Sequence, residues 1–376
     1  MPGIAGIITK GPVKEKVPGL HQMVQALIHE PSYTSGIYIN EELGVGIGWA
    51  NRYQSFADCM PVWNETSDVG LIYYGENFAD KGLTARLHSR GHRFDPSNAT
   101  YLVHLYEEQG PDFIKQLNGW FSGVLMDLRK GEVSLFNDRY GMQRIYYHET
   151  KEAVYFSSEA KSLLRVHPKL RYLDMKSLGE FFSFGCALDN RTLFSDVSLL
   201  PPGSVWNFEN GSVKRKHRYF DPDTWEHQTP LGNEAFYKNF RETFGRILPK
   251  YFDTPNGVAL SLTGGLDTRM ILSGIDIPRG QLPCYTFGGI YRDCFDVKIA
   301  RKVAKVCDQT HQVLEVGKEF FPQFPTLAEK TVYITDGNLN VSGAPDLYVN
   351  RLAREIAPVR LTGNYGSEIM RGARHL

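Results

Sequence analysis

The segment VALSLTGGLDT, residues 258–268, decides the fold of the second half of this chain. An apolar run of strand length ends in two adjacent glycines, and RMILSGI, residues 269–275, then continues as a helix would. Adjacent glycines let the backbone turn tightly with its N–H groups pointing one way, and a helix N-terminus adds unpaired donors and partial positive charge. The segment therefore predicts a strand, an anion-binding loop and a helix.

The side chains of this loop suit pyrophosphate together with a divalent metal. Thr263 and Thr268 offer hydroxyls, and Asp267 offers the kind of oxygen ligand that Mg²⁺ prefers. The loop lacks the Lys-Ser/Thr pair of the Walker motif. Taken alone, Gly-Gly-x-Asp after a strand also fits an ordinary turn in which Asp267 caps the helix.

Around this loop the sequence alternates apolar strands with amphipathic helices. The strand-like runs are GVALSL, LPCYTFGG, HQVLEV and VRLTG, at residues 257–262, 282–289, 311–316 and 359–363. Residues 296–307 place their apolar side chains on one helical face and their lysines and arginines off it. This alternation predicts a parallel sheet covered by helices, with ligands bound at the carboxyl ends of its strands.

The first two hundred residues have a different pattern, which predicts a strand-rich domain with a few helices. Short runs rich in β-branched and aromatic residues are GIAGIIT, VGLIYYG, GWFSGVLMDL, GEVSLFNDR, RIYYHE and AVYFSS. Helical spacing is present at residues 102–117 and 158–164. The polar segment 208–230 has no sustained period and predicts a linker, or else a long surface loop within one domain. We therefore expect domains at 1–215 and 231–376, joined by a linker at 216–230.

Composition bears on three questions: the kind of partner, the role of the cysteines and the presence of membrane or signal segments. The 376 residues carry no formal net charge, which favours neither nucleic acid nor an acidic membrane surface as a partner. The five cysteines are odd in number and contain no Cys-x-x-Cys, so neither a disulfide framework nor a zinc site is expected. No stretch approaches the roughly 20 apolar residues of a membrane span, and the N-terminus lacks a signal-peptide pattern. We expect a cytoplasmic protein.

The loop at residues 263–268 resembles the PP-loop, Ser-Gly-Gly-x-Asp-Ser, of the N-type ATP pyrophosphatases, with Thr263 and Thr268 at the two Ser positions. VALSLTGGLDT and LTGNYGSEIMRG (361–372) resemble the synthetase domain of the asparagine synthetase family. In the front half, MPGIAGI, NDRYGMQRIYY, FSSEAKSLL and LLPPGSVWNF are similar, in order and spacing, to that family's glutaminase domain.

This resemblance covers nearly the whole chain and implies a mixed α/β and α+β architecture. An αββα N-terminal-nucleophile (Ntn-hydrolase-like) domain of the class II glutamine amidotransferases would precede a parallel-sheet PP-loop ATP pyrophosphatase domain. Members of the family continue through a long helical stretch that follows the position of residue 376, so the second domain is expected to be incomplete and the chain to be a fragment.

The resemblance further implies an ATP-dependent ligase that adenylates a carboxylate, aspartate or an analogue, and transfers it to an amine. Asp267 and Glu368 would hold Mg²⁺. The residues that would bind ATP and its pyrophosphate are Leu262, Thr263, Gly264, Gly265, Asp267, Thr268, Gly288, Gly289, Gly366 and Ser367. Its partners would be small-molecule carboxylate and amine substrates, and a homodimer is compatible with it.

The glutamine site departs from the family at three positions. Pro2 stands where glutamine-hydrolysing members have a nucleophilic Cys, Tyr74 replaces an Asn that donates to the oxyanion, and Asn98 replaces the acid that holds the α-amine of glutamine. The other counterparts in this vestigial site are Arg52, Gly75 and Glu76. Each departure removes a different role, so glutamine hydrolysis is expected to be lost.

With glutamine hydrolysis lost, the nitrogen must come from another source. Relatives without the nucleophile close β-lactam or peptide rings with an amine inside the substrate, and Tyr365 lies where the β-lactam-forming relatives have a catalytic Tyr beside the second loop. Free ammonia is another donor. The remaining alternative is a non-catalytic remnant or scaffold protein.

Overall fold

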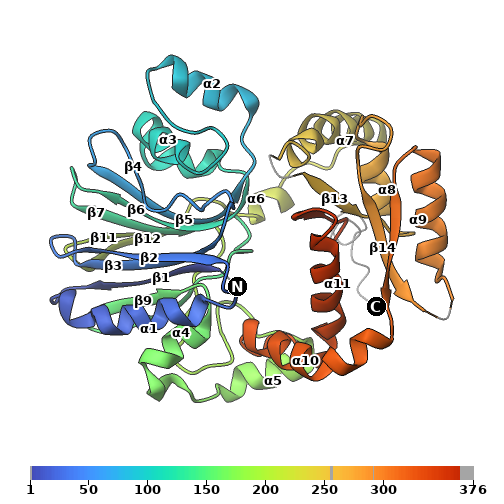
Figure 1. Cartoon of the computed structure of the whole chain (residues 1–376). Helices are drawn as coiled ribbons and strands as arrows, with labels where there is room; N and C mark the ends of the chain where they lie inside the picture. Colours follow the sequence, from blue (N-terminus) through green and yellow to red (C-terminus); the bar gives the residue numbers. More distant parts are fainter. Residues whose placement is uncertain (1, 255–256, 291, 365–376) are drawn as a thin grey trace. The chain divides into compact units, whose positions relative to one another are not determined.

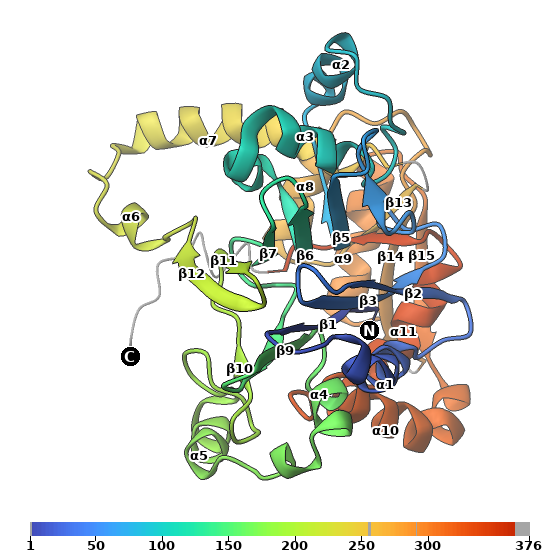
Figure 2. The ribbon, with the colours of Figure 1, turned by 90° about the vertical axis from the view of Figure 1, so that its left-hand side faces the viewer.

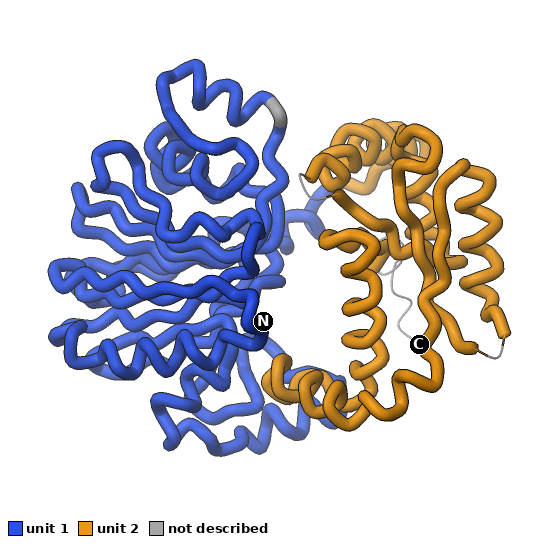
Figure 3. The backbone as a smooth tube through the Cα atoms, in the orientation of Figure 1, with its two compact units in different colours: residues 1–228 blue, residues 229–376 orange. Residues whose placement is uncertain are grey.

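The computed structural model describes residues 2–254, 257–290 and 292–364, and the chain divides into two compact units, Met1–Gln228 and Thr229–Leu376 (Figure 3). Among the described residues, no helix is both long and apolar enough to span a lipid bilayer.

The strands of unit 1 form two antiparallel sheets. The first sheet contains β1 (Gly3–Thr9), β2 (Tyr33–Asn40), β3 (Val45–Arg52), β8 (Tyr146–Glu149), β9 (Ala153–Ser157) and β10 (Ser198–Leu199). The second contains β4 (Val62–Trp63), β5 (Val69–Asn77), β6 (Gly119–Asp127), β7 (Glu132–Asn137), β11 (Ser204–Glu209) and β12 (Ser212–Arg218). Their orders are β10-β8-β9-β1-β3-β2 and β12-β11-β7-β6-β5-β4.

Helices cover the outer face of each sheet. The helices of unit 1 are α1 (Val17–Leu27), α2 (Lys81–Ser89), α3 (Tyr101–Gln109), α4 (Ala160–Val166), α5 (Met175–Phe184) and α6 (Asp223–Glu226), with 3₁₀ turns at Lys14–Lys16, Gly110–Gln116 and Pro168–Leu170. Helices α1 and α4 pack on the first sheet, and α3 packs on the second. Figures 1 and 2 show the resulting helix–sheet–sheet–helix layers, which agree with the αββα arrangement implied by the resemblance.

Strand β1 shows why the front-half sequence folds into layers. All seven of its residues are buried, and alternate side chains enter two different cores. Ile4 and Ile8 fill the core between the sheets, whereas Ala5 and Ile7 lie under α1. A strand covered on both faces must be apolar at every position, which matches the unbroken run GIAGIIT.

Unit 2 is built on a parallel sheet in the order β15-β14-β13-β16. Its strands are β13 (Val258–Ser261), β14 (Cys284–Gly289), β15 (His311–Val316) and β16 (Val359–Leu361). Its helices are α7 (Asn233–Ile247), α8 (Leu266–Ser273), α9 (Phe295–Val306), α10 (Phe324–Ile334) and α11 (Ala344–Arg354), with 3₁₀ turns at Leu248–Tyr251, Lys318–Gln323 and Val341–Gly343. The parallel sheet predicted from the sequence is confirmed.

The connections of this sheet create a switch point between β13 and β16. Helices α8 and α9 lead from β13 to β14 and from β14 to β15, and they share a core on one face of the sheet. Helices α10 and α11 lead to β16 and pack on the opposite face (Figure 1). The connection that arrives at β16 therefore runs over the face opposite to the one covered by α8 and α9, and the change of face falls between the neighbouring strands β13 and β16. The carboxyl ends of the strands at such a point are where ligands bind in open parallel sheets.

The polar segment 208–230, which the sequence analysis assigned mainly to a linker, is partly structured. Residues 212–218 form β12, the edge strand of the second sheet, and α6 follows. The lysines of this segment suggested a solvated linker, but in the fold they make specific contacts. Lys214 pairs with Glu132 at 2.7 Å, and Lys216 Nζ lies 4.0 Å from the centre of the Trp206 ring. Lysines protect an exposed edge strand from pairing with another chain, so such a strand has the composition of a linker.

The core between the two sheets makes Phe156 a sensitive position. Its side chain is fully buried, and a Cβ added at Gly6 would lie 2.2 Å from its ring, so the ring fills its space completely. We expect Phe156→Ala to destabilise unit 1 by about 3–5 kcal/mol, because it leaves a cavity. The matched control Phe182→Ala, at a phenylalanine that is 80% exposed, should change stability by less than about 0.5 kcal/mol.

Urea unfolding of the full chain followed by tryptophan fluorescence measures this difference for unit 1 alone, since all five tryptophans lie before residue 229. Equal effects of the two substitutions would contradict the assigned core.

Candidate functional site

The glycine-rich loop lies at the switch point of unit 2. Strand β13 ends at Ser261, and α8 begins at Leu266 with Gly265 as its N-cap residue in an extended conformation. The first turn of the helix and the preceding N–H groups therefore lie at the carboxyl edge of the sheet. The strand, loop and helix predicted from VALSLTGGLDT are all present.

Two threonine hydroxyls shape the loop. The Thr263 N–H donates to Thr268 Oγ1 at 3.1 Å, and the Gly265 N–H donates to Thr263 Oγ1 at 3.1 Å. The two hydroxyl oxygens are 3.2 Å apart, and Thr268 is buried. The threonines thus hold the first and third of three consecutive N–H groups, which explains why hydroxyl-bearing residues stand at both ends of the Gly-Gly turn.

A carboxylate contacts the remaining N–H group of the loop, that of Gly264. The Gly264 N–H donates to Asp296 Oδ1 at 2.8 Å, and Asp296 lies in the first turn of α9. An N–H group at this position that binds an anionic oxygen is also suited to a phosphate oxygen. The sequence analysis missed Asp296 as a contact of the loop, because only the fold brings together two residues that are 32 positions apart.

The loop after β16 meets the glycine-rich loop. Strand β16 pairs with β13, and a Cβ added at Gly363 would lie 2.7 Å from Asp267 Cβ and 2.8 Å from the Thr268 nitrogen. The backbone at Gly363 therefore lies directly on the first turn of α8, where a larger residue would not fit. The expected site residues of the second loop, Tyr365, Gly366, Ser367 and Glu368, lie outside the described residues.

Other residues expected near the nucleotide serve the packing of the sheet. The Leu262 side chain is fully buried in the core under α8 and α9, and its carbonyl accepts a hydrogen bond from Thr286 Oγ1 at 2.6 Å. Gly288 and Gly289 end β14, and a Cβ at Gly288 would lie 3.0 Å from Val297 on α9. At Leu262 the side chain is thus not available to a nucleotide, and both the N–H and the carbonyl are paired with β14.

In unit 1, the counterparts of a glutamine site collect at one end of the sandwich. Pro2 directly precedes Gly3, which pairs with Ala50 two residues before Arg52 at the end of β3. The positive charge of Arg52 is close enough to Glu76 on β5 to act on the pKa of its carboxyl. Burial raises the pKa of Glu76 to about 7, and the positive charge of Arg52 opposes this rise. Burial also raises the pKa of Tyr74 well above its ordinary value.

The backbone of this site is more constrained than its side chains. Gly75 has a φ of 120°, and a Cβ there would lie 1.9 Å from the Trp120 carbonyl oxygen, so only glycine fits. The Asn98 side chain is engaged within its own loop: its amide donates to Asp95 at 3.1 Å, and its oxygen accepts from the Thr100 N–H at 3.0 Å. The Asn98 amide itself carries no negative charge for an ammonium group, and the carboxylate beside it, that of Asp95, is engaged with Asn98 and Ser97.

The cysteine in the loop after β3 is not a replacement nucleophile. Burial raises the pKa of Cys59 to about 11, so its thiol is protonated at neutral pH. The reactive species of a cysteine is the thiolate, which this environment disfavours.

Comparison with known proteins agrees with this geometry. Residues 1–220 match the family described as "Glutamine amidotransferase domain". The chain belongs to this family. Within it, the chain is related to the asparagine synthetases, as the sequence motifs predicted.

Two curated relatives come from Bacillus subtilis (strain 168). Asparagine synthetase [glutamine-hydrolyzing] 2 is 27% identical over 99% of this chain and 52% of its own length, and asparagine synthetase [glutamine-hydrolyzing] 1 is 23% identical over 99% and 59%. The chain thus spans about half the length of the curated relatives it matches.

A solved structure of glutamine phosphoribosylpyrophosphate amidotransferase from B. subtilis, complexed with ADP and GMP, covers 83% of this chain and 65% of its own. It has a TM-score of 0.42 and 13% identity, a similarity too low to add to the assignment.

The raised pKa of Glu76 makes the stability of this family member depend on pH. Folding favours the protonated carboxyl, so Glu76 lowers the unfolding free energy progressively as pH rises from 4.5 to about 7, and by a constant amount above that. Glu76→Gln should therefore stabilise unit 1 more at about pH 8 than at about pH 5, by on the order of 2 kcal/mol.

Urea unfolding followed by tryptophan fluorescence at the two pH values measures this difference. Glu42→Gln, at an exposed glutamate, controls for the loss of one carboxylate. A Glu76→Gln effect that is the same at both pH values would contradict the buried, raised carboxyl.

Proposed function

We propose that this chain is part of an ATP-dependent, amide-forming ligase of the asparagine synthetase type. The observation that carries the proposal is the loop after β13, in which three consecutive N–H groups each donate to an oxygen acceptor at the switch point of a parallel sheet. A row of N–H groups held by its own side chains, at the start of a helix, is suited to a pyrophosphate.

The residues present fit ATP with Mg²⁺. Pyrophosphate oxygens would take the N–H groups of Gly264 and its neighbours and the hydroxyls of Thr263 and Thr268. Asp267, in the first turn of α8, would be a Mg²⁺ ligand together with Glu368. Mg²⁺ would neutralise charge on the leaving pyrophosphate. The nucleoside would lie beside the carboxyl ends of β13 and β14.

The chemistry has two steps. An oxygen of the substrate carboxylate, aspartate or an analogue, attacks the α-phosphorus of ATP, and the bond to pyrophosphate breaks, which gives an acyl-adenylate. The nitrogen of an amine then attacks the acyl carbon, loses a proton, and displaces AMP to form the amide. The loop stabilises negative charge on the departing pyrophosphate, a form of electrostatic stabilisation that contributes strongly in enzymes.

The amine comes from a source other than glutamine in this proposal. Pro2 has no nucleophilic side chain, and the phenol of Tyr74 and the amide of Asn98 replace groups with different charge and reach. Free ammonia, or an amine within the substrate as in ring-closing relatives, would then supply the nitrogen.

One observation favours a second candidate, a non-catalytic protein. Asp296 places a carboxylate on the Gly264 N–H, where a phosphate oxygen would bind, and like charges repel. If this contact persists, the loop is closed to nucleotides. Measurement of ATP binding separates the two candidates.

We expect Mg²⁺·ATP to bind the full chain, and Asp267→Asn to weaken that binding roughly ten-fold or more, equivalent to about 1.4 kcal/mol, because a charged metal ligand is lost. Isothermal titration calorimetry measures the affinity. Asp276→Asn, at an exposed aspartate beyond α8, is the matched control and should leave it unchanged.

Exchange of labelled pyrophosphate into ATP, screened over a panel of carboxylates, then tests the adenylation step. If ATP fails to bind, or binds equally well to Asp267→Asn, the ligase proposal is wrong and the scaffold candidate is supported.

We also expect the chain to release no glutamate from glutamine and to form no covalent adduct with a diazoketone analogue of glutamine, because the nucleophile is missing. Mass spectrometry of the intact chain detects such an adduct. An adduct on any residue of unit 1 would refute the loss of glutamine hydrolysis while leaving the ATP site untouched.

A further inference from the structure

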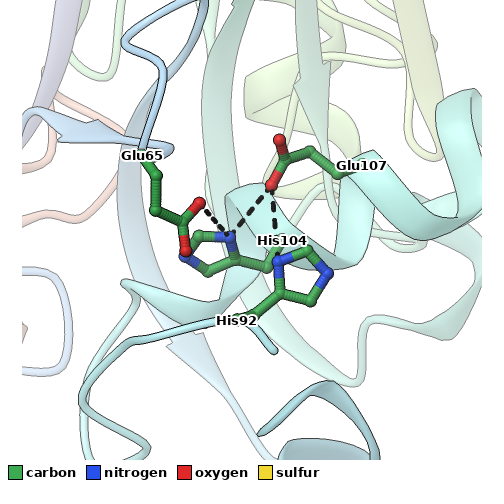
Figure 4. A group of neighbouring side chains, drawn as sticks. All are labelled: Glu65, His92, His104 and Glu107. Carbon is green, nitrogen blue, oxygen red and sulfur yellow. Dashed lines mark hydrogen bonds and ion pairs between the residues drawn. The ribbon is translucent and has the colours of Figure 1, made fainter. Parts of the chain in front are cut away.

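A cluster of two histidines and two glutamates lies in unit 1, on the helical layer outside the second sheet. Glu65 lies in the turn between β4 and β5, His92 lies in the loop after α2, and His104 and Glu107 are three residues apart on α3. One nitrogen or oxygen from each residue points into a common space, and these four atoms all lie within 4.8 Å of one another (Figure 4).

The distances are close to those of a tetrahedral metal site. His104 Nδ1 is 3.0 Å from Glu107 Oε2 and 3.5 Å from Glu65 Oε2, and His92 Nδ1 is 3.8 Å from the same Glu107 oxygen. Zinc binds nitrogen and oxygen at about 2.0–2.1 Å, which places neighbouring ligands of a tetrahedron about 3.3 Å apart. These three separations are within about half an ångström of that value, and pairs that are up to 4.8 Å apart would have to close further around a bound ion.

The ligand atoms are oriented by a second set of polar contacts. Asn64 is buried and donates to the other oxygen of Glu107 at 2.7 Å. The Arg93 N–H donates to Glu65 Oε1 at 3.2 Å, and His92 Nε2 lies 3.1 Å from Glu108 Oε1. Metal sites characteristically fix their ligands in this way, through carboxylates, amides and main-chain groups bonded to the atom that does not bind the metal.

The charge balance also favours a cation. The carboxylates of Glu65 and Glu107 converge on one imidazole nitrogen of His104, whose side chain is only 3% exposed. One N–H can satisfy one of these acceptors well, and the two partly exposed carboxylates that share it repel each other unless a cation lies between them. A divalent ion among the four atoms satisfies every one of them.

We propose that Glu65, His92, His104 and Glu107 form a binding site for a divalent transition metal of the Zn²⁺ type. Imidazole and carboxylate ligands suit zinc, and four protein ligands fill its tetrahedral shell without an open position. The site is therefore structural: it joins the β4–β5 turn, the loop after α2 and α3, segments that are otherwise separate in sequence. The spacing of the cysteines gave no indication of zinc because this ligand set contains no cysteine.

The test uses the full chain after removal of metals by a chelator. Zn²⁺ alone is titrated in competition with a chromophoric chelator, and Co²⁺ alone is added in a parallel sample to record its visible absorption. We expect one equivalent of Zn²⁺ to bind, the intense absorption bands of tetrahedral Co²⁺ to appear, and the thermal midpoint of tryptophan fluorescence to rise with Zn²⁺ concentration.

Ligand variants locate the site. His92→Gln and Glu65→Gln should each weaken Zn²⁺ binding by roughly a hundred-fold and abolish the rise in thermal midpoint. Glu65 is half exposed, so Glu65→Gln is expected to fold even if His92→Gln disturbs the loop after α2, and far-ultraviolet circular dichroism checks the fold. His21→Gln, at an exposed histidine of α1 on the other sheet, is the matched control and should behave as the unaltered chain.

Three results would overturn the proposal: no binding of Zn²⁺ in the micromolar range, binding that persists unchanged in Glu65→Gln and His92→Gln, or an equal loss in His21→Gln. Each readout is independent of ATP and glutamine, so the result stands apart from the proposed ligase function.

Discussion

Strand β13 is buried on both faces, and its backbone can leave hydrogen-bonding groups unpaired only where it exits the sheet. Ala259 enters the core under α10 and α11, Leu260 enters the core under α8 and α9, and β14 and β16 pair along both edges. The first N–H groups beyond the pairing of the sheet are therefore those of the loop at Thr263 to Gly265. Burial of the strand, rather than any property of the loop alone, determines where the donors gather.

The threonine hydroxyls and Asp296 complete this arrangement by giving each of those N–H groups an oxygen acceptor. An N–H group that is held in place by a local acceptor needs little reorganisation to meet a phosphate oxygen, and preorganisation of this kind is what makes a binding loop effective. One of these contacts opposes the binding of a phosphate group, because an incoming anion must displace the Asp296 carboxylate from the Gly264 N–H.

Two glycines of unit 1 are held in place by their immediate surroundings. Gly75 is fixed by its positive φ and by the nearby Trp120 carbonyl, and Gly6 is fixed by the Phe156 ring. By the resemblance, Pro2 and Tyr74 stand where glutamine-hydrolysing members have other side chains. Packing constrains the interior of the sandwich tightly, whereas side chains at the ends of its strands change without loss of the fold.

The sequence by itself determined the strands that are buried on both faces, the strand–loop–helix at residues 258–275, and the family. These follow from local patterns: unbroken apolar runs, paired glycines and motifs in a fixed order. It did not determine β12, whose lysines resemble a linker, nor the Gly264–Asp296 contact, nor the meeting of Glu65, His92 and His104. β12 pairs with the adjacent strand β11, but its lysines show their role only beside Glu132 and the Trp206 ring. The contact and the cluster likewise join residues that lie apart in sequence and that only the packing of sheets and helices brings within a few ångströms of one another.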